Sequence, residues 1–168
     1  MICQFGGGVV RRHHAVVRAL ASIIHQVSLA RVAIEKRSAT LDRQANGNVQ
    51  EGQMDIIVMN LDGCVQYIDV AIVSPVIANA NLLANAGRRD GYAARRAENK
   101  KKQRYQVRNL VPFVIELGGR PGNLARKFVS SLFDDEDPGK AIGISRVWST
   151  LSCVMNSAIS EQLSVSEV

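Results

Sequence analysis

Cysteine and aromatic residues are scarce in this chain of 168 residues, in which aromatics make up only 5%. The three cysteines, Cys3, Cys64 and Cys153, lie far apart and form no CxxC pair. This spacing excludes the usual zinc ligand sets and a disulfide framework. It also predicts a reducing, intracellular location, nuclear or cytoplasmic.

Long apolar runs are missing as well. The most apolar stretch, residues 15–34, is interrupted by two arginines and a histidine, so we expect neither a signal peptide nor a membrane-spanning helix. The content of 46% hydrophobic and 21% charged residues is instead typical of a globular protein. We expect one domain over residues 11–158, with flexible termini at 1–10 and 159–168.

The hydrophobic pattern predicts an α/β fold with a mixed sheet of about four strands. Helical spacing of apolar residues alternates with short runs rich in β-branched residues, and a long polar loop is expected over residues 37–53. In chain order we expect a helix over residues 14–28, a strand over 30–36, a hairpin of two strands over 54–60 and 65–74, and a helix over 79–104, with breaks possible at Gly87 and Gly91. A strand over 111–117 and two helices, around Phe128 and Trp148, complete the order.

The Asp62-Gly63 dipeptide predicts a tight turn in the central hairpin. A two-residue loop would place Asp69 opposite Ile56 and turn Asp55 to the other face of the sheet. A three-residue loop with Gly63 in the left-handed region would instead place Asp55 directly opposite Asp69. We expect the second register.

Asp69 is the most informative residue because it lies inside an apolar strand. An unpaired charge buried there would cost several kcal/mol, so a cation, a metal or hydrogen-bond donors should meet it. Two opposed carboxylates form an oxygen site that suits Mg²⁺ or Mn²⁺. Lys101 on the following helix is placed to orient a metal-bound water, and Glu35 or Glu116 at strand ends could add a ligand.

Positive charge is concentrated between residues 88 and 108. This segment holds nine bases and two acids, against 21 bases and 15 acids in the whole chain. Such a local field indicates a polyanionic partner, most commonly nucleic acid, in contact through its phosphates. With so few aromatics, we expect little readout of bases. The candidate nucleic-acid-binding residues are Arg88, Arg89, Arg95, Arg96, Lys100, Lys102, Arg104 and, in a later loop, Arg120.

Other motifs indicate less chemistry. His14 and His25 are too far apart on one helix to chelate an ion, and we interpret them and His13 as surface or helix-terminal residues. Residues 6–8 lack the Lys-Ser/Thr of a phosphate-binding loop, and the pattern around Ser74 lacks the partners of a serine hydrolase.

The order Asp55, Tyr67-Ile68-Asp69-Val70, then a helix carrying Lys101 and Tyr105, resembles the restriction-like endonuclease domain of site-specific non-LTR retrotransposon reverse transcriptases. These domains belong to the PD-(D/E)xK nuclease superfamily. The resemblance covers roughly residues 11–155. It implies a restriction-endonuclease-like sheet and Mg²⁺-dependent hydrolysis of phosphodiester bonds in DNA.

The resemblance also implies roles for single residues. Asp55 and Asp69 would bind the metal, and Lys101 would be the catalytic lysine, displaced onto the helix because the usual position holds Ala71. Met54 stands where the motif has proline, and Lys100 to Lys102 are three candidates for the lysine role. The expected catalytic set is Asp55, Asp69, Lys101 and Glu116.

Two other functions fit the same residues. The chain could be a catalytically inactive nucleic-acid-binding or assembly module with the same fold. It could also be an α/β protein whose basic segment is only a solvated helix face, in which case salt-dependent affinity for DNA is not expected.

Overall fold

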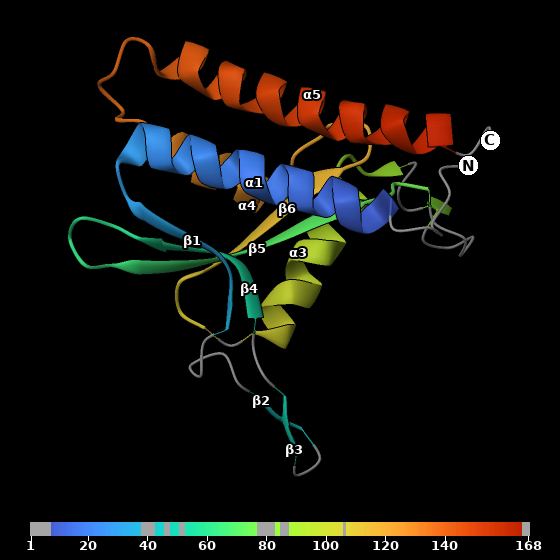
Figure 1. The fold of residues 1–168 in the computed structure, drawn as a ribbon, viewed down its shortest axis with the longest axis horizontal. Coiled ribbons are helices and arrows are strands. Elements are labelled where there is room, and N and C mark those ends of the chain that lie inside the picture. Colours follow the sequence, from blue (N-terminus) through green and yellow to red (C-terminus); the bar gives the residue numbers. More distant parts are fainter. Residues whose placement is uncertain are drawn as a thin grey trace.

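The computed structural model describes residues 8–37, 43–45, 48–50, 53–76, 83–84, 88–105 and 107–165. Its elements confirm the predicted α/β class with a four-stranded mixed sheet. In chain order they are α1 (Gly8–Ser28), β1 (Arg31–Arg37), β2 (Arg43–Ala45), β3 (Asn48–Gln50), β4 (Gln53–Met59), β5 (Val65–Val73), α3 (Tyr92–Arg104), β6 (Leu110–Glu116), α4 (Asn123–Ser131) and α5 (Lys140–Val165) (Figure 1).

The sheet has the strand order β1-β4-β5-β6, with β4 and β5 at its centre as predicted. β1, β4 and β5 pair antiparallel, and β5 pairs parallel to β6. Helix α3 lies between β5 and β6 in the chain, so it forms the crossover that a parallel pair requires.

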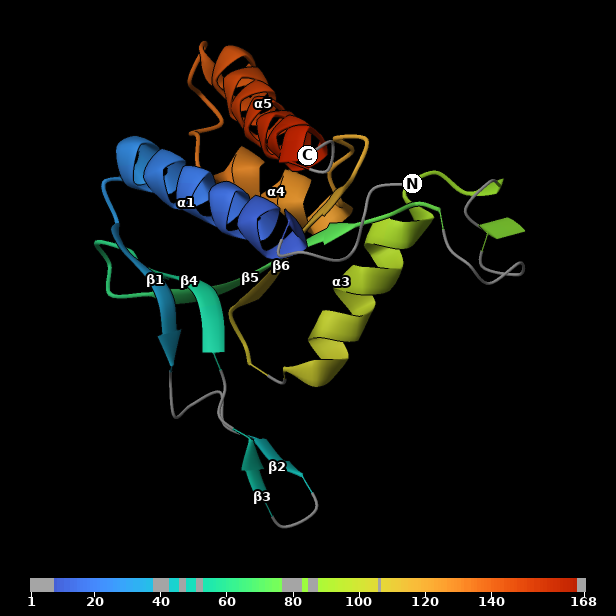
Figure 2. The same ribbon diagram turned by 45° about the vertical axis from the view of Figure 1, so that its right-hand side comes forward.

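Helices cover the two faces of the sheet unequally. α1, α4 and α5 lie together on one face, whereas α3 lies on the opposite face (Figures 1 and 2). The core forms under the three helices, where Ile56 and Val58 of β4 meet Ile68 and Val70 of β5. Because side chains alternate along a strand, Asp55, which precedes Ile56, and Asp69, which lies between Ile68 and Val70, face the side of α3.

The central hairpin has the three-residue loop that we predicted. Ile56 pairs with Ile68, and the pairing continues to Met59 and Val65. Asn60 N donates to Cys64 O at 2.9 Å, which closes the loop over residues 61–63. Gly63 has φ 81°, the left-handed conformation that glycine adopts at low cost.

The register has a direct consequence for the acids. The pairing ends at Ile56 and Ile68, one residue short of Asp55 and Asp69, so the two acids follow the last pair at the same end of the hairpin. Both line the same cavity.

Some elements differ from the prediction. The helix expected over residues 79–104 has the break that was considered possible at Gly91, whose φ of 65° cannot continue a right-handed helix, so α3 begins at Tyr92. Much of the earlier part, residues 79–82 and 85–87, lies outside the described residues. The expected loop over 37–53 is wrong in part, because it contains the antiparallel pair β2–β3.

The ends of the domain also extend further than expected. α1 begins at Gly8 and α5 continues to Val165, so both helices include residues that we had assigned to flexible termini. Among the described helices, none has the length and apolar character needed to cross a membrane.

Candidate active site

The candidate site forms where β4 and β5 separate. Their pairing ends at Ile56 and Ile68, so the backbone of Val70, which is paired with β6 on one side, has no partner in β4 on the other. Side chains take over this role: Val70 N donates to Asp55 Oδ2 at 2.7 Å, and Val70 O accepts from Lys101 Nζ at 3.3 Å. Since buried backbone groups need partners, this opening fixes both side chains.

Lys101 is the lysine that reaches the acids. Its Nζ lies 2.6 Å from Asp69 Oδ1, and Asp69 is only 9% exposed. On α3, Lys101 follows Ala94 and Glu98 along the buried face, at the i, i+4, i+7 spacing that one helix face requires. Lys100 and Lys102 are exposed and point elsewhere, so the structure selects Lys101 from the three candidates.

His13 joins the cluster from the other face of the sheet. Its Nε2 lies 3.3 Å from Asp55 Oδ2 and 3.3 Å from Val70 O. The interpretation of His13 as a surface or helix-terminal residue is wrong, because α1 packs on the sheet and places this ring in the opening. The sequence did contain a signal for this position, because His13 has the i, i+4, i+7 spacing with the buried residues Val17 and Leu20 that places all three on one face of α1.

The pKa values of the two aspartates are shifted in opposite directions. Burial favours a higher pKa for Asp55, but the hydrogen bond and charge of His13, with the Val70 N–H and Lys101, outweigh it and lower the pKa. For Asp69, burial outweighs the charge and hydrogen bond of Lys101, and the neighbouring Asp55 adds to the rise of the pKa. The hydrogen bond to Asp55 raises the pKa of His13 against the effect of burial. Asp55 is therefore the more readily ionised acid.

Both aspartates line an open cavity of about 400 Å³. The guanidinium of Arg104 stacks on the ring of Tyr105, 5.1 Å from its centroid, at the end of α3. Burial, together with the charge of Asp69, raises the pKa of the Tyr105 hydroxyl, opposed in part by Arg104. The lining residues are His14, Glu35, Gln53, Asp55, Asp69, Arg104 and Tyr105.

Glu35 brings a third carboxylate to the cavity. In the pairing of β1 with β4 it lies between Ile34, opposite Ile56, and Lys36, opposite Met54, and hence beside Asp55. Its φ of 51° is unusual for a residue with a side chain. Its Oε1 is 3.3 Å from Nε2 of His14, which was also expected to lie at the surface.

The donor set fits a magnesium or manganese ion. Within the described residues, no group of three or more His, Cys, Asp or Glu side chains is placed to hold a metal. Mg²⁺, however, is commonly bound by one or two carboxylates and keeps several waters, with phosphate oxygens completing its sphere. Asp55 and Asp69 supply that minimum of hard oxygen ligands, whereas the set does not fit a four-ligand zinc centre.

Glu116 does not join this cluster. The parallel register sets it opposite Val73, while Pro112 lies opposite Asp69, and four residues of strand span roughly 13 Å. Its buried carboxylate accepts from Ala94 N at 3.2 Å. Glu116 thus satisfies an N–H of the first turn of α3, and the expectation that it is catalytic is not supported by its position.

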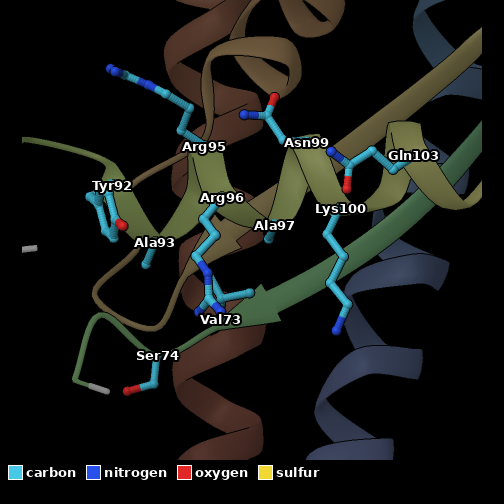
Figure 3. A pocket seen from close by; sticks show the side chains of 10 residues that line it. All are labelled: Val73, Ser74, Tyr92, Ala93, Arg95, Arg96, Ala97, Asn99, Lys100 and Gln103. Carbon is cyan, nitrogen blue, oxygen red and sulfur yellow. The ribbon is translucent and has the colours of Figure 1, made fainter. Parts of the chain in front are cut away.

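The predicted nucleic-acid-binding residues are spread around α3. Arg96 and Lys100 line a groove of about 670 Å³ between α3 and the end of β5 (Figure 3). Lys102 lines a second groove, of about 420 Å³, between α3 and the start of α4. Arg120 Nη1 bonds to Asp90 Oδ1 at 2.7 Å. Of the remaining candidates, Arg95 lines both grooves, Arg104 lines the active-site cavity, and Arg88 and Arg89 are exposed ahead of α3.

The arrangement joins two acids, a lysine and an arginine at one end of a basic helix. Such a site can hold a divalent cation and a phosphate side by side. A scan against protein-family models and a search of curated proteins find no match for the chain.

Proposed function

We propose that the protein is a metal-dependent nuclease that hydrolyses phosphodiester bonds in DNA, of the transposon-derived restriction-like type. One observation carries the proposal: Asp55 and Asp69 line one cavity, and Lys101 Nζ lies 2.6 Å from Asp69 Oδ1. The acids and the lysine occur in the same chain order as in the retrotransposon endonucleases described above. The basic helix that supplies the lysine also supplies contacts for a polyanion.

Each residue of the cluster has a chemical role in this proposal. A bound Mg²⁺ or Mn²⁺ would lower the pKa of a coordinated water and offset the charge of the phosphate. Asp55 and Asp69 would hold the ion through their carboxylate oxygens. His13 positions Asp55 through the 3.3 Å contact to Oδ2.

Lys101 keeps one donor for the reaction. Its ammonium group has three hydrogens, and Asp69 Oδ1 and Val70 O accept two of them. The third can hydrogen-bond to the attacking water or to a phosphate oxygen, which stabilises charge as it develops. Arg104, at the rim of the same cavity, binds the phosphate group.

A nucleic-acid-binding module without activity is the alternative that one observation favours. Each aspartate already has a positively charged or chargeable partner, since His13 contacts Asp55 and Lys101 contacts Asp69. Such pairing neutralises a buried acid cluster in the absence of any metal. The two functions differ in metal-dependent cleavage.

Nicking of supercoiled plasmid with Mg²⁺ or Mn²⁺ tests the proposal. We expect nicking by the wild-type chain and a loss of roughly a hundredfold or more in Asp69→Asn and in Lys101→Met. The matched control is Lys100→Met, a neighbouring exposed lysine, which should retain most of the rate at saturating DNA. DNA binding without nicking under any metal condition, or equal rates in all variants, would contradict the proposal.

A further inference from the structure

Helix α3 exposes a broad, acid-free surface. It stands on the face of the sheet opposite α1, α4 and α5 (Figure 2). Ala93, Ala94 and Glu98 are buried, while most residues from Arg95 to Arg104 are exposed. Glu98, the only acid of α3, is 3% exposed, so the outer surface carries bases and amides alone. A helix that is merely solvated normally alternates the sign of its charges.

Two basic grooves flank this surface. On the β5 side, Arg96 and Lys100 line the groove of about 670 Å³. On the α4 side, Lys102 and Lys127 line the groove of about 420 Å³. Arg95 and Asn99 border both grooves, so they stand on the crest between them.

The crest carries side chains suited to reading bases. Figure 3 shows Arg95 and Asn99 leaving α3 on the side away from β5, whereas Arg96 and Lys100 point toward β5. Gln103 lines the groove on the β5 side, and its side chain runs along the helix between these two rows. Arg95, Asn99 and Gln103 are spaced four residues apart along the helix. Asn and Gln form bidentate hydrogen bonds with N6 and N7 of adenine, and Arg forms them with O6 and N7 of guanine.

The dimensions and the charge agree with a duplex. An α-helix with side chains is roughly 10–12 Å wide, and the major groove of B-DNA is about 12 Å wide. Arg96, Lys100 and Arg104 are like charges at i, i+4 spacing, an arrangement that destabilises a free helix and that nearby phosphates would relieve. Bases on both flanks would meet the two phosphate backbones that border the groove.

We propose that α3 enters the major groove of double-stranded DNA and that Asn99 on its crest, with Gln103 one turn further along the helix, selects adenine-containing sites. This inference rests on the proposed function and adds a sequence preference to it. It departs from our expectation, based on the few aromatics, of little base readout.

The same placement links recognition to the cavity of the candidate site. Arg96 and Lys100 line the groove on the β5 side, and the next residue of their row, Arg104, lines the cavity with Asp55 and Asp69. From Arg96 to Arg104 the helix rises roughly 12 Å. The DNA strand whose phosphates contact Arg96 and Lys100 would therefore continue past Arg104 into the cavity that contains Asp55 and Asp69.

Selection from a library of randomised DNA duplexes tests this inference. The full chain is incubated with the library in EDTA, which separates binding from cleavage, and bound duplexes are sequenced for the wild type, Asn99→Ala, Gln103→Ala and Lys102→Ala. We expect the wild type to enrich a motif with adenine. Asn99→Ala and Gln103→Ala should each lose roughly tenfold of the preference at one position.

Lys102→Ala is the matched control because its side chain lies beside the crest, in the flanking groove. It should weaken binding to all duplexes alike and reduce the salt slope by about one. Alanine favours helix at these exposed positions, so the variants should fold, as circular dichroism would verify. A library bound without a motif, a motif unchanged in Asn99→Ala, or tighter binding of single-stranded DNA or RNA would overturn the inference.

The outcomes separate the two proposals. Plasmid nicking without an enriched motif overturns major-groove reading and leaves the nuclease standing. An enriched motif without nicking supports the reading helix and contradicts the nuclease. Absence of binding to any duplex at low salt overturns both.

Discussion

At the scale of single residues, the side chain of Asp55 replaces the backbone partner that β4 would otherwise supply to Val70. Its Oδ2 accepts the N–H of Val70 at 2.7 Å, in the place where β4 has left β5. The carboxylate is thus fixed by the backbone of the strand that carries Asp69. His13 holds the same oxygen from the opposite face, so three elements position one acid.

The pair of His13 with Asp55 makes stability depend on pH. Because the folded pKa of His13 is raised above its unfolded value of about 6.5, the stabilisation is complete below that value and is lost as pH rises through the folded pKa. In EDTA, we expect His13→Gln to unfold more easily than the wild type by about 1 kcal/mol near pH 6. Urea unfolding should show this difference shrinking toward pH 9.

Asp55→Asn provides the control for this measurement. In its background, His13→Gln should no longer change the pH dependence, because the partner charge is gone. A difference between wild type and His13→Gln that stays constant from acid to alkaline pH would contradict the assignment.

At the scale of elements, buried glutamates from elsewhere in the fold cap two helices. Neither α3 nor α4 has a side-chain hydrogen bond from its own N-cap residue, which is glycine in both. Glu116 of β6 bonds to Ala94 N in α3, and Glu98 of α3 bonds to Leu124 N in α4 at 2.8 Å. These acids join β6, α3 and α4 into one unit behind Lys101.

Gly122→Ala tests this linkage. A Cβ at position 122 would overlap the carboxylate of Glu98, so the side chain must leave Leu124 N and remain buried without that partner. We expect a loss of about 1–3 kcal/mol in the free energy of unfolding, measured by urea denaturation.

Gly118→Ala is the matched control, because a Cβ there meets nothing within 4 Å. It should change stability by less than about 0.5 kcal/mol. Equal stability of the two variants would argue against a tight contact between Glu98 and the start of α4.

At the scale of the whole molecule, local patterns predict the sheet and its central hairpin. The β-branched runs predict β4 and β5, and the Asp62-Gly63 turn predicts their hairpin, with the three-residue loop as the expected one of two possible registers. Helical spacing of Ala94, Glu98 and Lys101 could have identified the inward lysine. These features are local, so sequence alone contains them.

Features that depend on long-range packing could not be predicted in this way. His13 reaches Asp55 only because β4 and β5 separate and α1 packs over the opening. Glu116 lies away from the cluster because of the parallel register of β6, which no turn fixes. The hairpin β2–β3 was missed although Asn46-Gly47, between the paired Ala45 and Asn48, is a strong hairpin dipeptide.

Mn²⁺ binding measured by electron paramagnetic resonance shows whether Asp55 and Asp69 together hold a divalent ion. We predict that the wild-type chain with duplex DNA binds Mn²⁺ and that Asp55→Asn and Asp69→Asn lose this binding. At saturating DNA, Lys100→Met should bind Mn²⁺ as the wild type does. Equal Mn²⁺ binding by the wild type and both aspartate variants, or none by the wild type, would contradict the account.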